Sequence, residues 1–183
     1  MPAVLTLAGR RVVLTALVDT GNTLTDPATG RPVLVAEADS LEELLPPGLR
    51  PGPAELDVSQ CPDLVPPLAA MAALRAGETT AIVNAARLRI KESDRLASTA
   101  ALLRALGGSA EEYPDRLVVH GGGLRGGDAQ GANDHRIVMA AAVAALGCGE
   151  KVCVTDAHAI NKSYPDFFDE LNKLGGRCNV DMG

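Results

Sequence analysis

The pattern of hydrophobic and polar residues divides the chain into two parts of different texture. Residues 1–45 are strand-like, because β-branched apolar runs alternate with turn-rich segments. A stretch rich in Pro and Gly follows at residues 46–53 and predicts a linker. Beyond it, helical and strand-like periods alternate to the end of the chain. We therefore expect a short β-rich segment over 1–45, a linker over 46–53 and an α/β region over 54–183. The extended runs of the first part are Arg11–Val18 and Pro32–Ala36.

The α/β region repeats strand and helix in a βα series. Apolar residues at helical spacing predict helices over Leu64–Arg75, Ser93–Leu106, Arg136–Leu146 and Asp166–Leu174. Strands are predicted over Thr80–Ala85, Ser109–Tyr113, Arg116–His120 and Lys151–Thr155, the middle two as a hairpin around Pro114-Asp115. No such unit can bury its apolar face alone. The predicted fold class is therefore α/β, with repeated βα units, helices packed against mixed sheets, and the whole forming part of one domain.

Composition narrows the kind of core and the class of partner. Hydrophobic residues make up 46% of the chain but aromatic residues only 2%, so Ala, Leu and Val must build the core. The net charge of −6 argues against a nucleic-acid or membrane-surface role. Against this acidic background, one local basic cluster stands out, formed by Arg87, Arg89, Lys91 and Arg95.

Targeting, membrane and metal signals are weak. The first residues lack the pattern of a secretory signal, and the longest apolar run, Ile137–Gly147, is too short to cross a bilayer. The four cysteines show no CxxC pair and no His at metal spacing. We expect reduced thiols in a cytoplasmic protein, with no metal site.

Three polar segments carry Lys or Arg immediately before a stretch of helical period. They read LRIKESDRL at Leu88–Leu96, NDHRIVM at Asn133–Met139 and NKSYPDFF at Asn161–Phe168. A cation on a loop that opens a helix favours anion binding, since free backbone N–H groups and the helix dipole attract negative charge. Three such junctions, with acids and a His among them, predict a site for a small polyanionic substrate.

Each candidate residue also has a purely structural interpretation. Asp63 precedes a helix and is either its N-cap or a group that accepts a hydroxyl proton. Glu92 belongs to a solvated charged turn, or it donates a proton if it is partly buried. Asn133-Asp134 and Ser163 are natural N-caps, and the neighbouring cations are then surface charges. Gly121–Gly127 (GGGLRGG) lacks the GK[ST] ending of a phosphate loop and predicts a mobile surface loop.

The motif order PDLVP, LRIKESDRL, NDHRIVM, KSYPDFF closely resembles the C-terminal part of 5-enolpyruvylshikimate-3-phosphate synthase, over residues 55–176. This family moves the enolpyruvyl group of phosphoenolpyruvate to the 5-hydroxyl of shikimate 3-phosphate, without a metal or organic cofactor. The resemblance implies that Asp63 is the general base and a ligand of shikimate, Lys91 a phosphate ligand that also transfers protons, and Glu92 the acid that protonates the methylene carbon. It also implies phosphoenolpyruvate contacts for Arg95, His135, Arg136 and Lys162.

The resemblance covers only part of the family's site. Its members place their substrates between two similar domains, and nothing in residues 1–50 matches the N-terminal domain. We therefore expect that the isolated chain does not convert its substrates to product, and that a separate chain could supply the missing domain. A second expectation is that Asp63, Lys91, Arg95, Arg136 and Lys162 converge at one end of the sheet.

The first part of the chain resembles another family. Ala16–Asp26, reading ALVDTGNTLTD, and Pro27–Val35, reading PATGRPVLV, are similar to the aspartic peptidase that processes sigma-E in sporulation. This resemblance implies a catalytic role for Asp19, in a pair with a second copy from a partner chain. The alternatives to the transferase are therefore a peptidase based on Asp19 and a non-catalytic fusion or truncation product. Asp19 is expected to lie far from the transferase-like residues.

Overall fold

The structure, a computed structural model, describes residues 2–7, 10–15 and 54–180 of the chain. The chain divides into two compact units, Met1–Gly52 and Pro53–Gly183. In the first unit, β1 (Pro2–Leu7) pairs antiparallel with β2 (Arg10–Thr15), with Pro2 opposite Thr15. The predicted strand at Arg11–Val18 overlaps β2, whereas β1 was not predicted. Asp19 and the predicted strand Pro32–Ala36 lie outside the described residues.

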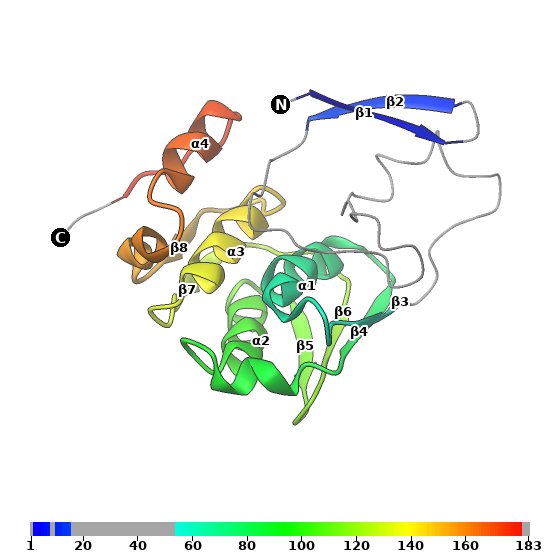
Figure 1. The fold of residues 1–183 in the computed structure, drawn as a ribbon. Helices are drawn as coiled ribbons and strands as arrows, with labels where there is room; N and C mark the ends of the chain where they lie inside the picture. The colour runs from blue at the N-terminus through cyan, green and yellow to red at the C-terminus, as the bar shows by residue number, and fades with distance from the viewer. Residues whose placement is uncertain (1, 8–9, 16–53, 181–183) are drawn as a thin grey trace. The chain divides into compact units, whose positions relative to one another are not determined.

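The second unit is built on a mixed sheet with the strand order β3-β4-β6-β5. Strand β3 (Ala54–Asp57) runs parallel to β4 (Thr79–Val83), while β6 (Leu117–His120) is antiparallel to both β4 and β5 (Ser109–Glu112). The predicted hairpin is therefore confirmed as β5 and β6. Figure 1 shows these strands side by side below α1.

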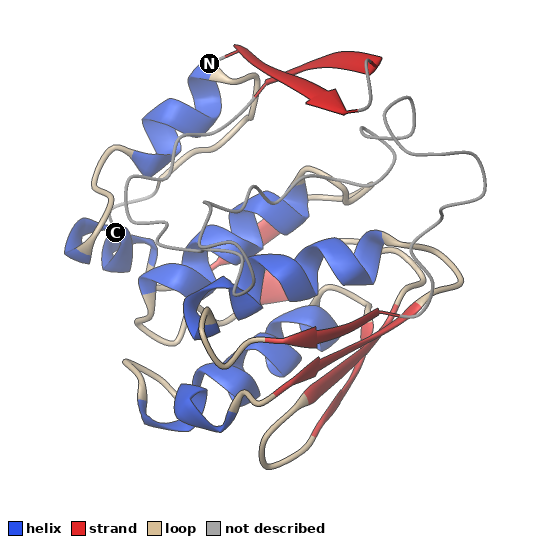
Figure 2. Ribbon diagram, turned by 45° about the vertical axis from the view of Figure 1, so that its right-hand side comes forward, coloured by secondary structure: helices blue, strands red, loops and turns tan. Residues whose placement is uncertain are grey.

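Alternation along the strands gives this sheet one buried face and one face open to solvent. Thr80, Ile82, Leu117 and Val119 are buried, whereas their neighbours in sequence are partly or well exposed. Helices α1 (Val65–Leu74) and α2 (Arg95–Ala105) cover the buried face. Figure 2 shows the helices gathered on one side of the four strands.

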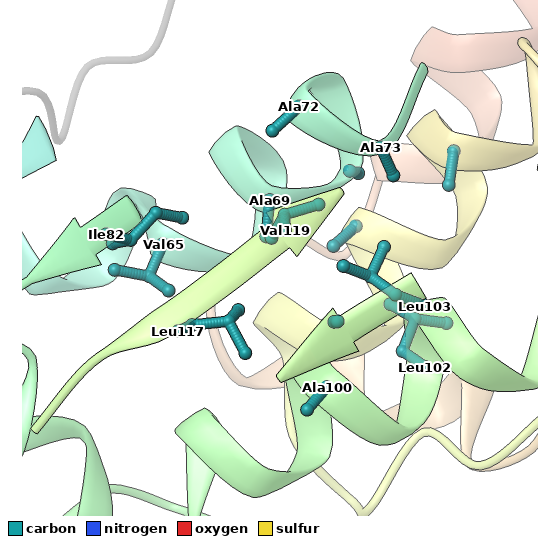
Figure 3. Packing of buried hydrophobic residues seen from close by; sticks show 14 of the residues in the cluster. Val65, Ala69, Ala72, Ala73, Ile82, Ala100, Leu102, Leu103, Leu117 and Val119 are labelled. Carbon is teal, nitrogen blue, oxygen red and sulfur yellow. The ribbon is translucent and has the colours of Figure 1, made fainter. Parts of the chain in front are cut away.

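The main core lies where these helices meet the sheet and α3 (His135–Ala145). Ala-rich faces of α1 and α3 pack against each other, and small side chains let the two helices approach closely. Figure 3 shows Leu102 and Leu103 of α2 and Ala69 of α1 around Val119 of β6. Each buried Leu contributes about 1.5–3 kcal/mol relative to an exposed one. The expected core of Ala, Leu and Val is confirmed by this cluster.

A smaller cluster forms around the last elements. Strand β7 (Gly127–Ala129) is parallel to β8 (Val152–Val154), followed by the 3-10 helix η4 (Ala157–Lys162) and α4 (Phe167–Lys173). Phe167, Phe168 and Leu171 of α4 pack with Val138 of α3. Within the described part of the chain, no helix has the length and apolar character needed to cross a membrane.

The segment predicted as a mobile surface loop, Gly121–Gly127, is held by its backbone and ends in a strand. The Gly121 and Arg125 N–H groups donate to the carbonyls of Glu78 and Leu106 at 2.7 and 2.8 Å. Leu124 is buried, and Gly127 opens β7. Residues 121–126 have no regular secondary structure, as predicted, and only Gly127 belongs to a strand, which forms by pairing with β8 and was not predicted.

Candidate active site

The candidate residues stand at the beginnings of helices and at the ends of parallel strands. Asp63 lies in the 3-10 helix η2 (Pro62–Leu64), which follows β3. Lys91 and Glu92 follow the 3-10 helix η3 (Ala86–Ile90), which comes after β4. Because β3 and β4 are parallel neighbours, their carboxyl ends meet at one edge of the sheet, and this edge is a common position for ligand sites.

The guanidinium group of Arg95 is the centre of the arrangement. Arg95 is the first residue of α2, and its side chain is only 1% exposed. Its Nε donates to Asp134 Oδ2 at 2.9 Å, its Nη1 donates to Asp63 Oδ1 at 2.7 Å, and its Nη2 donates to Glu92. A second bond from Nη2 reaches Asp134 Oδ1 at 3.2 Å. One buried cation therefore joins three carboxylates from three separate segments.

Asp63 collects positive charge from three directions. Besides Arg95, the Nζ of Lys91 lies 3.3 Å from Asp63 Oδ1, and the Nη2 of Arg136 lies 3.3 Å from Oδ2. Arg136 also donates from Nη1 to the Asp63 carbonyl at 3.4 Å. Partial burial works against ionisation, but the charges of these three cations, led by Arg136, outweigh it and hold the pKa of Asp63 below its ordinary value. Asp63 is therefore a carboxylate at neutral pH.

Asp134 joins Arg95 to the beginning of α3. Its side chain is fully buried, caps α3 by accepting from the Arg136 N–H at 2.9 Å, and accepts from Ser93 Oγ at 3.0 Å. Burial opposes its ionisation, yet the hydrogen bond from Arg95 and the helix cap lower its pKa overall. The predicted cap at Asn133-Asp134 is confirmed. The ion pair with Arg95 was missed, because an N-cap position in a sequence says nothing about a distant partner.

His135 follows Asp134 as the first residue of α3 and has a buried ring nitrogen without a hydrogen bond among the described residues. Its residue exposure is 6%, and no atom in the described part of the chain makes a hydrogen bond to its buried Nδ1. The closest carboxylate oxygen, Asp134 Oδ1, is 4.0 Å away. Burial lowers the pKa of His135, and this effect exceeds the opposing attraction of the Asp134 charge. The imidazole is therefore neutral at pH 7.

Lys162 contacts Asn133, next to the cluster, and not the carboxylate of Asp63. It ends η4, and its Nζ donates to the backbone carbonyl of Asn133 at 2.6 Å and to Asn133 Oδ1 at 3.2 Å. It therefore contacts the loop that leads into Asp134. Of the five residues expected to converge, Asp63, Lys91, Arg95 and Arg136 are joined by ion pairs, and Lys162 is attached to the adjoining loop.

Two predicted caps and part of the basic cluster have other positions. Asp63 does not cap α1, whose N-cap is Leu64, because the 3-10 helix η2 intervenes. Ser163 is the C-cap of η4, and the N-cap of α4 is Asp166, so Ser163 does not cap α4. Arg89 points to the hairpin, where its Nη2 donates to the Tyr113 carbonyl at 2.6 Å.

The arrangement is suited to anion binding and proton transfer. Around the buried Arg95 it offers two cations that are about one third exposed, Lys91 and Arg136, with side-chain exposures of 31% and 30%. Asp63 and Glu92 are exposed to a similar degree and are the accessible carboxylates. In the described part of the chain, no group of three or more His, Cys, Asp or Glu residues is placed to hold a metal ion. A hollow of about 1020 Å³ along β8 is lined by none of these residues.

Comparison with known proteins identifies the family. The family model for EPSP synthase (3-phosphoshikimate 1-carboxyvinyltransferase) matches residues 6–171. The 3-phosphoshikimate 1-carboxyvinyltransferase of Clostridium acetobutylicum is 52% identical over 122 residues, which are 66% of this chain and 28% of the relative. That of Methanocella arvoryzae is 46% identical over 126 residues, 69% of this chain and 30% of the relative.

A solved structure agrees with the sequence relatives. An EPSP synthase from Acinetobacter baumannii superposes with a TM-score of 0.60 at 29% identity, over 63% of this chain and 28% of that chain. This chain thus spans less than a third of the length of the relatives it matches. The family match begins at residue 6, so it includes most of residues 1–45, the segment for which a resemblance to a sporulation peptidase was predicted.

Proposed function

The chain belongs to the EPSP synthase (3-phosphoshikimate 1-carboxyvinyltransferase) family, and we propose that its polar cluster forms part of a site that transfers the enolpyruvyl group of phosphoenolpyruvate to the 5-hydroxyl of shikimate 3-phosphate. The observation that carries this proposal is the meeting of Lys91, Arg95 and Arg136 on the single carboxylate of Asp63. Addition of the hydroxyl group to the enol phosphate, followed by elimination of inorganic phosphate, requires a base, an acid and cations for several anionic groups. The cluster supplies each of these.

In this proposal, Asp63 is the base that accepts the hydroxyl proton. Its lowered pKa keeps it ionised and therefore able to accept a proton, but it also makes Asp63 a weak base while all three cations face it. When Lys91 or Arg136 turns to a phosphate or carboxylate of the substrates, Asp63 loses part of that stabilisation. Its basicity then rises at the moment when the hydroxyl group is in place.

The other assignments follow from exposure and position. Lys91, Arg136 and Lys162 carry the anionic groups of the substrates, since each ends in a donor group near the surface. Arg95 is too deeply buried to move, so it anchors the site and offers its outer donors to phosphoenolpyruvate. Glu92 lies beside those donors and is the acid that protonates the methylene carbon. His135 lines the floor of the same site.

The proposed site is only one part of the family's site. The chain spans 28% of the length of the Clostridium acetobutylicum relative. Further anion contacts must come from residues outside the matched region, whether they belong to another chain or to a longer form of this one. Each charge-assisted contact is worth about 1.5–3 kcal/mol, so three missing contacts lower substrate affinity by at least three orders of magnitude.

Growth of an aromatic-auxotrophic strain tests the proposal. The strain receives this chain alone, or this chain with a separately expressed remainder of the Clostridium acetobutylicum relative, from which the matching 122 residues are removed. We expect growth only with both parts. The Arg136→Ala chain should fail in the same pairing, whereas Glu170→Gln on α4 should support growth as the unchanged chain does.

The outcomes separate the two halves of the proposal. Growth with this chain alone would overturn the claim that the site is incomplete. No growth with both parts, when pull-down shows that they associate and fold, would overturn the claim that this cluster carries the transfer reaction.

A further inference from the structure

Glu92 occupies a donor of Arg95 that a bound anion would otherwise take. The guanidinium group has five N–H donors. Those that face inward are bound to the fully buried Asp134. The outer contacts go to Asp63 and Glu92, whose side chains are 41% and 42% exposed. An anion that approaches Arg95 from solvent therefore meets one of these two carboxylates first.

The two carboxylates are held with very different strength. Asp63 forms ion pairs with Lys91, Arg95 and Arg136, and both of its oxygens are engaged. Within the described ranges, the hydrogen bond and the ion pair of the Glu92 side chain are with Arg95 alone. Exchange for an incoming anion therefore requires the loss of one ion pair at Glu92 and of at least three contacts at Asp63. Glu92 is the group that leaves.

The charge balance of the cluster decides what happens to Glu92 next. Asp63 from η2, Asp134 at the start of α3 and Glu92 itself are set against Lys91, Arg95 and Arg136, so carboxylates and cations are equal in number. The neutral His135 of α3 adds no charge. A bound dianion makes the neighbourhood negative, and the displaced Glu92 has lost its cation. Both changes favour the protonated form of a carboxyl group.

We infer that Glu92 is a built-in competitor for the anion site, which an anionic ligand displaces from Arg95 and which solvent then protonates more readily than before. This inference deepens the proposed function, on which its catalytic meaning rests, because substrate binding itself then loads the acid. Its thermodynamic consequence is independent of turnover. Since binding takes up a proton, the affinity for an anion falls as the pH rises.

Sulfate is a suitable probe, because it carries two charges and does not titrate near neutral pH. Calorimetric titration of the full chain with sulfate, in buffers of different ionisation enthalpy, measures the protons taken up. We expect a net uptake of protons that is larger at about pH 5 than at pH 7, because an ordinary glutamate carboxyl group titrates at about pH 4.3. In Glu92→Gln the uptake should disappear, and sulfate should bind about tenfold more tightly, because the competing charge is gone. The Glu170→Gln variant removes another carboxylate paired at i,i+3, with Lys173 at 2.8 Å, and should bind sulfate as the unchanged chain does.

Three results would overturn the inference. One is an unchanged affinity and proton uptake in Glu92→Gln, and another is the absence of sulfate binding to every variant. The third is an uptake that persists in Glu92→Gln but is lost in His135→Gln, which would assign the proton to the imidazole. The proposed function fails separately, by the growth test, since sulfate binding requires no second substrate and no transfer.

Discussion

Arg95 and Asp134 form an ion pair that is closed to solvent, with Nε and Oδ2 2.9 Å apart and side-chain exposures of 1% and 0%. The pair joins the first turn of α2 to the N-cap of α3. Because Arg95 also holds Asp63 and Glu92, the orientation of the whole cluster depends on this contact. Burying two charges is expensive unless both are fully hydrogen-bonded, and here Ser93 and the Arg136 N–H complete the set.

Replacing Asp134 by Asn tests the energetic role of this pair. Asn is as good an N-cap as Asp, so the substitution removes the charge and keeps the helix start. We expect a loss of about 1.5–3 kcal/mol in the free energy of unfolding, because Arg95 loses its one fully buried counter-ion and keeps only the partly exposed Asp63 and Glu92. Urea titration followed by circular dichroism measures it. The exposed Asp128 of β7 provides the control, and Asp128→Asn should stay within about 0.5 kcal/mol. Equal midpoints for the two variants would contradict this role.

Because of His135, we expect the free energy of unfolding to fall on mild acidification. The pKa of His135 in the folded chain lies below the ordinary value of 6.5. Between these two pKa values the unfolded chain binds more protons than the folded chain, so the free energy of unfolding rises with pH. The contribution of His135 to this free energy is complete above about pH 6.5 and is lost as the pH drops below that value. The contribution is at most about 1.4 kcal/mol for each pH unit.

Urea titrations between about pH 5 and pH 7 measure this slope. His135→Gln should flatten it, whatever the variant's absolute stability, because Gln does not titrate. His158→Gln changes a histidine of η4 outside the cluster and serves as the matched control. If the slope is the same in His135→Gln and in the unchanged chain, His135 does not govern this pH dependence.

The elements that the sequence predicts are those whose own residues favour them. The periods over Leu64–Arg75 and Ser93–Leu106 correspond to α1 and α2 within two residues, the latter shortened because Asp94 caps it through the Ala97 N–H at 3.1 Å. Strand β3 reads AELD and β7 reads GDA, with almost no β-forming residues. They become strands only through pairing with β4 and β8. Such tertiary pairing leaves no local signal.

The residues that form the site could be predicted from the sequence, but their burial and their pairing could not. The sequence indicated which residues gather, but the fully buried position of Arg95 was not recognised. A signal for it existed, since Arg95 shares a helical face with Thr99, Leu102 and Leu103, all buried in α2. No comparable signal marks Asp134 as its partner, because the two residues are 39 positions apart in sequence.

Lys91 should control the ionisation of Asp63. The Nζ lies 3.3 Å from Asp63 Oδ1, and both its charge and its hydrogen bond lower the carboxyl pKa. In Lys91→Met, we expect the pKa of Asp63 to rise towards its ordinary value, since Met keeps the length of the side chain without the charge. Carbon-13 NMR titration of the Asp63 carboxyl carbon measures the change.

Lys173→Met on α4 removes a lysine that pairs with Glu170, outside the cluster. It should leave the Asp63 titration where it is in the unchanged chain. An Asp63 titration that is equally unmoved in Lys91→Met would show that Arg95 and Arg136 alone keep this carboxylate ionised.

Replacement of Gly131 should destabilise the loop that leads into Asp134. The Gly131 N–H donates to Thr155 Oγ1 at 3.1 Å, and its carbonyl accepts from the Asp134 N–H at 3.0 Å. A Cβ atom here would lie 2.2 Å from the Thr155 carbonyl oxygen, which is backbone and cannot rotate away. We expect Gly131→Ala to lose about 1–3 kcal/mol of stability and to weaken sulfate binding, since the loop must shift and move Asp134 with it. In Gly149→Ala the added Cβ meets no atom within 4 Å, so both quantities should stay unchanged. Urea titration and calorimetry of the two variants provide the comparison, and a Gly131→Ala chain as stable as Gly149→Ala would show that this loop does not constrain the site.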